Sequence, residues 1–394
     1  MSDRPIRIAH IITRMILGGA QENTLLTCRG LHEHPDYEVH LITGPAIGPE
    51  GELLSEAERL GIPVSIVPQM RREIHPWRDL ASARALKRIL RDLKPDIVHS
   101  HSTKAGIVGR YAAHAVRVPI VVHGIHGLAF HPYERWWRNK LYIAAERMAA
   151  RWTDQFVCVA DAMTEQALAA GIGRREQFVT IYSGMETEAF LDSGSQRAAT
   201  RKELGIGPDE FVVGKVARLF ELKGYEYVIE AAVRVLAAHP RVRFLFVGDG
   251  ILRERLEAQA EQLGIRDRIV FVGLVPSREV PRYVAAMDVL VHASLREGLA
   301  RVLPQALLAG KPVVSFRVDG APEVVIPGET GYLVEPKSVD GLVSSIVDVI
   351  EHPDQAAEMA AHGRELCRER FAWRTMVTQL DVLYRKLLGE QRPA

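Results

Sequence analysis

Short runs of apolar and β-branched residues alternate along the chain with longer segments in which apolar positions recur at helical spacing. In the first half, the runs that predict strands are residues 6–13, 37–43, 63–67, 96–101, 119–124, 155–160 and 177–183. A second series follows at residues 211–219, 242–250, 268–275, 288–294, 311–316 and 330–336. Helix-length segments separate most runs, an order typical of parallel sheets with crossover helices. The pattern predicts an α/β protein with two doubly wound, Rossmann-like domains.

The two series are separated by a stretch of small and polar residues, LDSGSQRAAT at 191–200, which we interpret as an interdomain linker. We therefore expect one domain over residues 1–190 and a second over 191–372. Ligands of such sheets bind at the carboxyl ends of the strands. Two sheets that face each other would form a cleft there, and the motifs described below all follow strands.

The composition narrows the class of protein. The chain has 394 residues, of which 47% are hydrophobic, so it can bury more than one core. Lys and Arg number 50 and Asp and Glu 49, which removes the general electrostatic argument for a nucleic-acid partner. Cys28, Cys158 and Cys367 lack metal or redox spacing, so we expect buried thiols in a reducing compartment.

The chain carries no segment of the length and composition of a signal peptide or a spanning helix. It enters a strand-like run almost at once, and no stretch approaches the ~18 apolar residues of a spanning helix. We therefore expect a cytoplasmic protein. Residues 132–152 mix aromatic with basic side chains on an expected helix, which would suit peripheral contact with the inner face of a membrane. Packing of that helix on its own sheet is the favoured interpretation.

The stretch EGLARVLPQ at residues 297–305 predicts a helix start with anion-binding capacity. Pro304 has no N–H group and is tolerated only in a first helical turn, so the helix should begin near Arg301. The amides of Ala300, Arg301 and Val302 would then face an anion at the positive end of the helix dipole. Gly298 would permit a close approach. An ordinary strand–loop–helix junction is the alternative.

Glu297 precedes this helix start and calls for a different ligand group. A carboxylate beside a bound phosphate would be repelled, so Glu297 is better suited to accept protons from the hydroxyls of a neutral polyol. A sugar phosphate satisfies both parts of the motif.

Two further stretches suit phosphate binding. Arg218 and Lys223 lie five residues apart around a turn after a strand, and such cations can neutralise a diphosphate. Gly18 and Gly19 follow the first strand, where bare backbone lets amides reach an oxyanion. Solvated surface cations and a plain turn are the alternatives.

Known nucleotide-binding fingerprints are missing. No G-x-G-x-x-G follows a strand, which argues against a nicotinamide enzyme, and there is no G-x-x-x-x-G-K-[ST] phosphate loop. The strands in FVGDG, which contains Gly248, and in FVGLV end with glycine and could border a flat nucleotide base. Asp-Gly turns are also common without a ligand.

Histidines concentrate in two clusters, HSHSTKAG and HGIHGLAFH. Neither matches a zinc-binding helix motif, so we expect no metal site. His126 lies just past the end of a buried strand, and we expect it at the functional site. His99, His114 and His123 are expected to be satisfied core histidines.

Taken together, these stretches resemble the retaining family 4 glycosyltransferases, also called glycosyl transferases group 1, of the GT-B fold. The matching segments are the GGA loop, HG followed by AFH, IYSGMETEAF, ARLFELKG, FVGDG, EGLARVLPQALLAGKPVV and DGAPEVVIPGETGYLV. The resemblance spans almost the whole chain. It implies a nucleotide-sugar in the C-terminal domain, an acceptor on the N-terminal domain, no metal requirement and a final helix, 373–394, that crosses back to the first domain.

The resemblance also implies roles for the residues at matching positions. Arg218 and Lys223 would clamp the diphosphate, with amides of Gly19, Arg301 and Val302 completing its shell.

Other positions carry over to the sugar and the base. Glu297 would hold hydroxyls of the donor sugar, His126 would lie at the reacting face, and the backbone of Val275 would border the base of a UDP or GDP donor. Gln305 stands where the family has a second Glu that holds the ribose, and Ser183 replaces the usual Asn. Gln keeps one acceptor but loses the charge, so we expect weaker donor binding rather than a dead enzyme.

These features lead us to expect a retaining glycosyltransferase that uses no cofactor. It would transfer sugar to a hydroxyl of a glycan, lipid-linked or small-molecule acceptor, in cell-envelope or exopolysaccharide synthesis. A GT-B sugar-nucleotide epimerase is one alternative, although an epimerase needs carboxylates around the sugar ring and only Glu297 is found. A non-catalytic nucleotide- or glycan-binding protein is the other.

Overall fold

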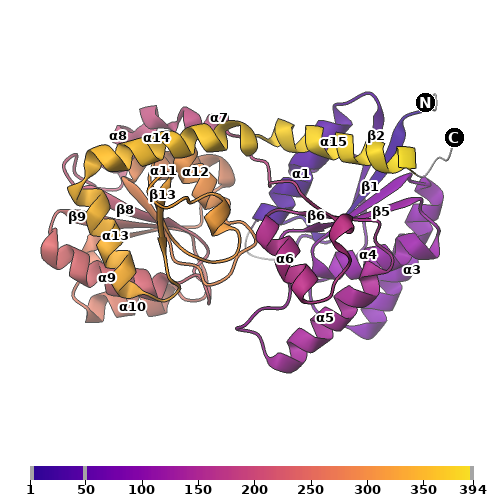
Figure 1. The fold of residues 1–394 in the computed structure, drawn as a ribbon, viewed down its shortest axis with the longest axis horizontal. Helices are drawn as coiled ribbons and strands as arrows, with labels where there is room; N and C mark the ends of the chain where they lie inside the picture. The colour runs from indigo at the N-terminus through magenta and orange to yellow at the C-terminus, as the bar shows by residue number, and fades with distance from the viewer. Residues whose placement is uncertain (1–3, 48–50, 391–394) are drawn as a thin grey trace. The chain divides into compact units, whose positions relative to one another are not determined.

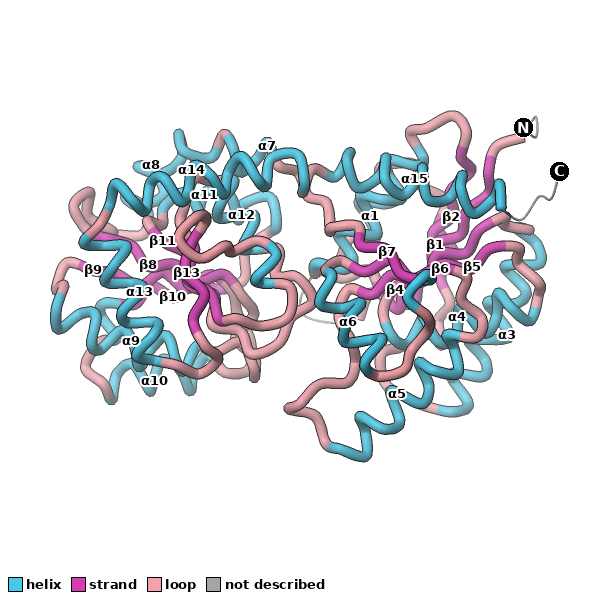
Figure 2. The backbone as a smooth tube through the Cα atoms, viewed as in Figure 1, coloured by secondary structure: helices cyan, strands magenta, loops and turns pink. Residues whose placement is uncertain are grey.

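The computed structural model describes residues 4–47 and 51–390, and the chain divides into two compact units (Figure 1). Unit 1 comprises Met1–Met185 and Trp373–Ala394, and unit 2 comprises Glu186–Ala372. Each unit contains one parallel sheet with helices on both faces (Figure 2). The thirteen runs predicted as strands all contain strands in the described residues, and the predicted fold class is confirmed.

The sheet of unit 1 has seven strands in the order β3-β2-β1-β4-β5-β6-β7, counted over the described residues. Its strands are β1 Ile6–Arg14, β2 Tyr37–Gly44, β3 Val64–Ile66, β4 Ile97–His101, β5 Ile120–Ile125, β6 Gln155–Cys158 and β7 Phe178–Thr180. Its helices are α1 Gly19–His32, α2 Leu54–Arg59, α3 Pro76–Leu93, α4 Thr103–Ala115, α5 Trp136–Ala150, α6 Asp161–Ala169 and α15 Trp373–Glu390.

Strand β1 shows how one strand serves both faces of this sheet. Successive side chains of a strand point to opposite faces. Ile8 and Ile12 join the core formed with α1 and α15, whereas Ala9 and Ile11 join the core formed with α3 and α4. The strand is therefore apolar almost throughout, as strands covered on both faces are.

The final helix α15 belongs to unit 1, where it packs beside α1. Its Asp381 accepts a 2.6 Å hydrogen bond from the hydroxyl of Tyr37 on β2, and its Tyr384 hydroxyl lies 2.6 Å from Nδ1 of His99 on β4. These contacts join the last helix of the chain to strands near its beginning.

The sheet of unit 2 has six strands in the order β10-β9-β8-β11-β12-β13. Its strands are β8 Phe211–Val216, β9 Val242–Val247, β10 Ile269–Gly273, β11 Val289–His292, β12 Val313–Phe316 and β13 Gly331–Val334. Its helices are α7 Glu188–Leu191, α8 Arg197–Glu203, α9 Tyr225–Ala238, α10 Arg253–Gln262, α11 Val280–Ala286, α12 Val302–Leu308, α13 Val339–Glu351 and α14 Pro353–Arg370.

The interpretation of residues 191–200 as a linker is wrong. The segment contains the end of α7, a 3₁₀ turn at Ser193–Gln196 and the start of α8, and it lies inside unit 2. Arg197 and Arg201 both form ion pairs with Asp288, with Nη2 of Arg201 2.6 Å from Oδ2 of Asp288. The polar residues that suggested a linker therefore fasten this segment to the loop before β11.

Two expectations from composition can be compared with the described residues. Cys28, Cys158 and Cys367 are buried free thiols, as predicted. Within the described part of the chain, no helix combines the length and the apolar character needed to cross a membrane.

Candidate active site

Unit 2 has a switch point in its strand order between β8 and β11. Strand β8 pairs with β9 on one side and with β11 on the other, so the connections leave in opposite directions. Ligands of open α/β sheets bind outside the carboxyl ends of the strands at such a point. The predicted residues of this unit follow those ends: Arg218 and Lys223 after β8, Gly248 after β9, Val275 after β10, and Glu297, Gly298, Ala300, Arg301, Val302 and Gln305 after β11.

Lys223 and Glu297 meet at this switch point although 74 residues separate them. Nζ of Lys223 donates to Oε1 of Glu297 over 2.6 Å, and the two side chains are 22% and 19% exposed. The loops that carry them are joined by a hydrogen bond from the amide of Leu295 to the carbonyl of Leu222, 2.8 Å long. The pair is partly shielded from water, yet both groups remain accessible to a ligand.

Gly224 lets the two loops approach this closely. Its φ is 66°, and a Cβ at this position would lie 1.9 Å from the carbonyl oxygen of Ala293. Any other residue would therefore suffer both backbone strain and a clash with backbone. The glycine after Lys223 thus sets the position of the ammonium group.

The backbone around Glu297 is also hydrogen-bonded to the loop after β12. The Glu297 amide donates to Oδ2 of Asp319 over 2.6 Å, and the amide of Gly320 donates to the carbonyl of Gly298 over 3.0 Å. Nε2 of His292, at the end of β11, lies 3.3 Å from Oε1 of Glu297. The carboxylate therefore sits in a fixed position between a lysine and a histidine.

The electrostatics of this group favour an ionised carboxylate. Burial opposes the charge of Glu297, but the Lys223 ammonium and then the contact with His292 outweigh burial, so the pKa of Glu297 lies well below its usual range. Burial lowers the pKa of His292, although Glu297 works against that shift. At neutral pH we expect an ionised carboxylate on Glu297 and a neutral imidazole on His292.

Lys215 is a buried cation that the sequence reasoning missed. It lies on β8 with no exposed surface, its Nζ is 4.9 Å from the ring centroid of Tyr225, and Nζ has no hydrogen-bond partner among the described residues. Burial, and then the charge of Lys223, lowers its pKa to about 7, against the opposing effect of Glu297. The signal was a lysine inside the otherwise apolar run FVVGKV.

Further polar atoms beside this group have no partner among the described residues. Nδ1 of His292 and Oγ of Ser294 are buried without a hydrogen bond to any described residue. Buried polar groups are nearly always paired with protein or with water, so unpaired atoms at a strand end indicate a place for a ligand or ordered water. His292 and Ser294 occur in an apolar run, DVLVHAS, that carried no recognisable motif.

The other predicted cation, Arg218, follows the end of β8. Its side chain is exposed, with the guanidinium 5.0 Å from the centroid of Phe220. Gly248 directly follows strand β9 and has a φ of 135°. A Cβ at this position would lie 2.0 Å from the carbonyl oxygen of Ala217. The end of β9 is thereby held against the chain that leads to Arg218. Val275 is half-buried, two residues beyond β10.

Helix α12 begins where Pro304 predicted. Arg301 is its N-cap and Val302 its first residue, so Pro304 lies in the first turn. Gln305 is the next residue and is half-buried. Its backbone N–H donates to the carbonyl of Arg301 over 3.1 Å. The anion-binding role of the amides of Arg301 and Val302 and the ribose-binding role of Gln305 stay predictions.

The remaining predicted residues belong to unit 1. Gly18 is the N-cap of α1 and Gly19 its first residue. The φ of Gly18 is 171°, which is extended backbone, so conformation alone does not require glycine there. His126 is half-buried just beyond β5, with Nε2 3.0 Å from Nδ1 of His101.

Of the three histidines expected in the core, two are buried and one is exposed. His99 and His123 are buried, the first beside Tyr384 and the second 3.0 Å from the hydroxyl of Ser100. The prediction for His114 is wrong, because it is exposed on α4 and stacks on Trp152. An apolar neighbourhood in sequence did not reveal which side of that helix faces water.

Comparison with known proteins identifies the family. The sequence-family model of the glycosyl transferases group 1 matches residues 196–366, and the sequence-family model of glycosyltransferase family 4 matches residues 17–189. The UDP-Gal:alpha-D-GlcNAc-diphosphoundecaprenol alpha-1,3-galactosyltransferase of Escherichia coli is 29% identical over 349 residues, 88% of each chain. The D-inositol 3-phosphate glycosyltransferase of Acidothermus cellulolyticus is 30% identical over 324 residues, 76% of this chain and 69% of its own.

A solved structure extends the likeness to the whole fold. The crystal structure of HepE from Anabaena in complex with UDP matches with a TM-score of 0.81 at 25% identity, over 97% of this chain and 100% of that one. The strand orders, the switch-point site and these similarities lead to one conclusion: the chain belongs to glycosyltransferase family 4, and it is a glycosyltransferase with the GT-B fold.

Proposed function

We propose that this glycosyltransferase is a retaining enzyme that transfers a sugar from a nucleoside-diphosphate sugar to a hydroxyl of a lipid-linked or glycan acceptor. The observation that carries the proposal is the Lys223–Glu297 pair at the switch point of unit 2. It places a cation for phosphate beside a carboxylate for sugar hydroxyls. The UDP donor in the E. coli relative's name and the UDP bound to HepE agree with this class of donor.

Lys223 and Arg218 would bind the diphosphate of the donor. Lys provides a point charge and Arg a planar fork of donors, which together suit a diphosphate. Lys223 is already held by Glu297 at 2.6 Å, so little side-chain freedom remains to be lost on binding. We expect these two cations, with the amides near Arg301 and Val302, to neutralise the diphosphate without a metal ion.

Glu297 would bind the sugar of the donor. Its Oε1 accepts from Lys223, and an ionised carboxylate has further lone pairs for the hydroxyls of a sugar. The backbone N–H of Glu297 is held by Asp319, and the contacts with Lys223 and His292 hold its carboxylate. An acceptor-only group in a fixed position favours a polyol over a second phosphate.

In the reaction, the bond from the anomeric carbon to the diphosphate oxygen breaks and a bond to the acceptor oxygen forms on the same face. The acceptor proton passes to the departing phosphate oxygen, so no second carboxylate is needed, in contrast with retaining hydrolases. Charge develops on the leaving diphosphate, and fixed cations there lower the barrier. Removal of one such donor typically costs ~10²–10³ in rate.

The residues assigned to the donor base do not distinguish one base from another. Gly248 and Val275 follow β9 and β10 and would border the base through backbone, and Gln305 would reach the ribose. UDP and GDP donors are the two candidates that we propose. Thermal unfolding with each nucleoside diphosphate separates them, because a ligand at 100 times its Kd adds ~2.7 kcal/mol of stability.

The acceptor side of the proposal draws on α5 in unit 1. Trp136, Trp137 and Leu141 are 70%, 46% and 53% exposed, while the helix turns Glu146, Ala149 and Ala150 inward. Lys140 lies 5.0 Å from the ring of Trp136. Exposed tryptophans beside basic residues suit a lipid headgroup region, so we propose peripheral membrane contact and a lipid-linked acceptor.

The experiment that tests the function is a product assay. Purified protein is incubated with UDP- or GDP-sugars and lipid-linked sugar acceptors, and the anomeric configuration of the product is read by NMR. We expect an α-linked product from an α-linked donor. An inverted product would overturn retention, and donor turnover without a glycoside product would overturn the transferase assignment for these acceptors.

The membrane contact is tested separately by co-sedimentation with vesicles that contain anionic lipid. We expect binding that weakens with salt and is lost in Trp136→Ser/Trp137→Ser. Exposed Tyr111 on α4 supplies the matched control, Tyr111→Ser. Equal binding of all three proteins would overturn the role of α5.

A further inference from the structure

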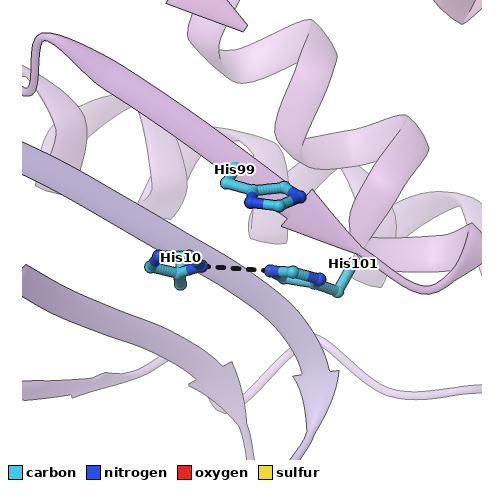
Figure 3. Close-up of side chains that lie close together, drawn as sticks. All are labelled: His10, His99 and His101. Atoms are coloured by element: carbon cyan, nitrogen blue, oxygen red, sulfur yellow. Dashed lines mark hydrogen bonds between the residues drawn. The ribbon is translucent and has the colours of Figure 1, made fainter. Parts of the chain in front are cut away.

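A group of histidines occupies the switch point of unit 1, between β1 and β4. His10 on β1 is paired in register with His99 on β4, and His101 lies two residues further along the same strand (Figure 3). Residues two apart on a strand share a face. All three rings therefore project from one face of the sheet, the face that α1 and α15 cover, and all three are buried.

The ring nitrogens converge. One ring nitrogen from each of the three histidines lies within 4.8 Å of the other two, and Nδ1 of His10 is 3.1 Å from Nε2 of His101. Zinc bonds of ~2.0–2.1 Å to imidazole at tetrahedral angles would separate two nitrogens by about 3.3 Å. The separation, which is a hydrogen bond between the two rings, is close to that value. An ion would replace the shared proton, which is released on binding.

We propose that His10, His99 and His101 form a binding site for one transition-metal ion of the zinc class. Imidazole is a good ligand for Zn²⁺, Cu²⁺ and Ni²⁺, and three imidazoles with an open fourth position form a known type of zinc coordination. The site lies in unit 1, whereas the donor phosphates are assigned to unit 2. The inference is therefore independent of the proposed function.

Groups around the three rings would orient them for a metal. Nδ1 of His99 lies 2.6 Å from the hydroxyl of Tyr384, and Nδ1 of His101 lies 3.0 Å from Nε2 of His126. These contacts leave Nε2 of both rings to face an ion. Such outer contacts fix the tautomer and direction of metal-binding histidines.

One of the proposed ligand atoms has no partner among the described residues. Nε2 of His99 is buried without a hydrogen bond to any of them. Burial also keeps the imidazoles neutral, because it lowers the pKa of His10 to about 3 and those of His99 and His101 well below the usual value. Neutral imidazole is the form that binds a metal.

Gly124 on β5 keeps a space open beside these rings. A Cβ there would lie 2.9 Å from Nδ1 of His101 and 3.2 Å from Nε2 of both His99 and His126. A cavity of about 10 Å³ lies here, lined by Asn23, His99, His101, Gly124 and His126 among others but not by His10. It borders two of the three proposed ligands and has room for about one water.

The test uses the full chain, stripped of metal with a chelator and titrated with Co²⁺ at pH 7.5 in the absence of donor. We expect one Co²⁺ per chain with the intense visible absorption of a four-coordinate ion, and displacement by Zn²⁺. We also expect Zn²⁺ at 100 times its Kd to raise the Tm by about 5–10 °C. Wild-type protein that binds no stoichiometric ion would overturn the proposal, whatever the variants do.

Variants separate this site from other histidines. We expect His10→Gln and His99→Gln each to lose the visible band and at least tenfold in affinity, because each removes one ligand. His123→Gln is the matched buried control, since His123 pairs with Ser100 on the opposite face, and His114→Gln is the exposed control. Binding retained in His10→Gln and His99→Gln, or lost equally in both controls, would contradict the assignment. Neither outcome depends on sugar transfer.

Discussion

The two units share one strand order through their first six strands, yet they place different chemistry at the point where that order reverses. In unit 2 the switch point holds formal charges, with Lys223 and Glu297 2.6 Å apart and Lys215 buried nearby. In unit 1 it holds neutral imidazoles, with His10 3.1 Å from His101. The fold supplies the location of a site, and the side chains at the strand ends decide which ligand it takes.

The difference also concerns solvent. The charged pair of unit 2 is about one-fifth exposed, as a site for a charged, hydroxylated ligand must be. The imidazoles of unit 1 are buried, which suits a small ion or a water molecule and excludes a nucleotide. Four predictions sharpen this comparison.

The largest effect is expected from removal of the charged pair. Lys223→Met and Glu297→Gln should each lower kcat at least ~10²-fold, because each removes a group that we propose to bind the diphosphate or the sugar. Steady-state kinetics at saturating donor measures the loss, and circular dichroism checks the fold. Lys202→Met, an exposed lysine on α8, is the control and should keep full activity. Activity within a few-fold of wild type in either variant would remove that residue from the mechanism.

The second prediction concerns the loop that positions Lys223. Gly224→Ala should lower the free energy of unfolding by about 2–4 kcal/mol, because it combines a left-handed backbone with a clash against the Ala293 carbonyl. Gly264→Ala is a matched control, since its φ is 69° against 66° for Gly224 but nothing lies within 4 Å of its Cβ. It should cost only ~1 kcal/mol. If urea denaturation gives equal losses of unfolding free energy for the two variants, the close contact with the Ala293 carbonyl contributes nothing.

The third prediction follows from the buried cation of unit 2. The pKa of Lys215 is lowered to about 7, first by burial and then by Lys223, whereas a lysine in the unfolded chain titrates near ~10.4. Between these values the unfolded chain binds a proton that the folded chain does not. Stability should therefore rise with pH from about 7 to about 10, by up to ~1.4 kcal/mol per pH unit from this group.

Lys215→Met provides the comparison. Denaturation across that pH range should give a variant that is more stable than wild type near pH 7, with a difference that shrinks as pH rises. Parallel curves for the two proteins would mean that Lys215 keeps its proton in the fold.

The smallest effect is expected at the ribose position. Gln305→Glu should change the affinity for the nucleotide donor less than ~tenfold, since one hydrogen bond is at stake. Isothermal titration calorimetry measures the change. A larger loss would mean that the site is built around the amide rather than around a carboxylate.

The fold could be predicted because its signal is local. Runs such as residues 37–43 and 242–250 contain enough β-branched and aromatic residues to predict strands, and Pro304 located the start of α12. Residues 191–200 were wrongly interpreted as a linker because composition does not reveal that Arg197 and Arg201 pair with Asp288, which lies 91 and 87 positions away. Distant ion pairs leave no pattern in a single sequence.

For the candidate site, the sequence indicated residue types but not the contacts between them. Glu297 and Lys223 were found through motifs that resemble a family, but their direct pairing depends on Gly224 and on the loop of Asp319. Lys215 and His292 were missed because a polar residue in an apolar run does not reveal burial or neighbours. The convergence of His10 with His99 and His101 likewise depends on the pairing of β1 with β4, which sequence separation hides.

The most direct test of the central claim is the binding of UDP and GDP to wild type, Lys223→Met and Glu297→Gln, measured by calorimetry without sugar or acceptor. If Lys223 binds the diphosphate and Glu297 binds the sugar, one nucleotide binds wild type, its affinity falls at least tenfold in Lys223→Met, and Glu297→Gln binds it no more weakly than wild type does. Unchanged affinity in Lys223→Met, or an equal loss in Glu297→Gln, would contradict this division of roles.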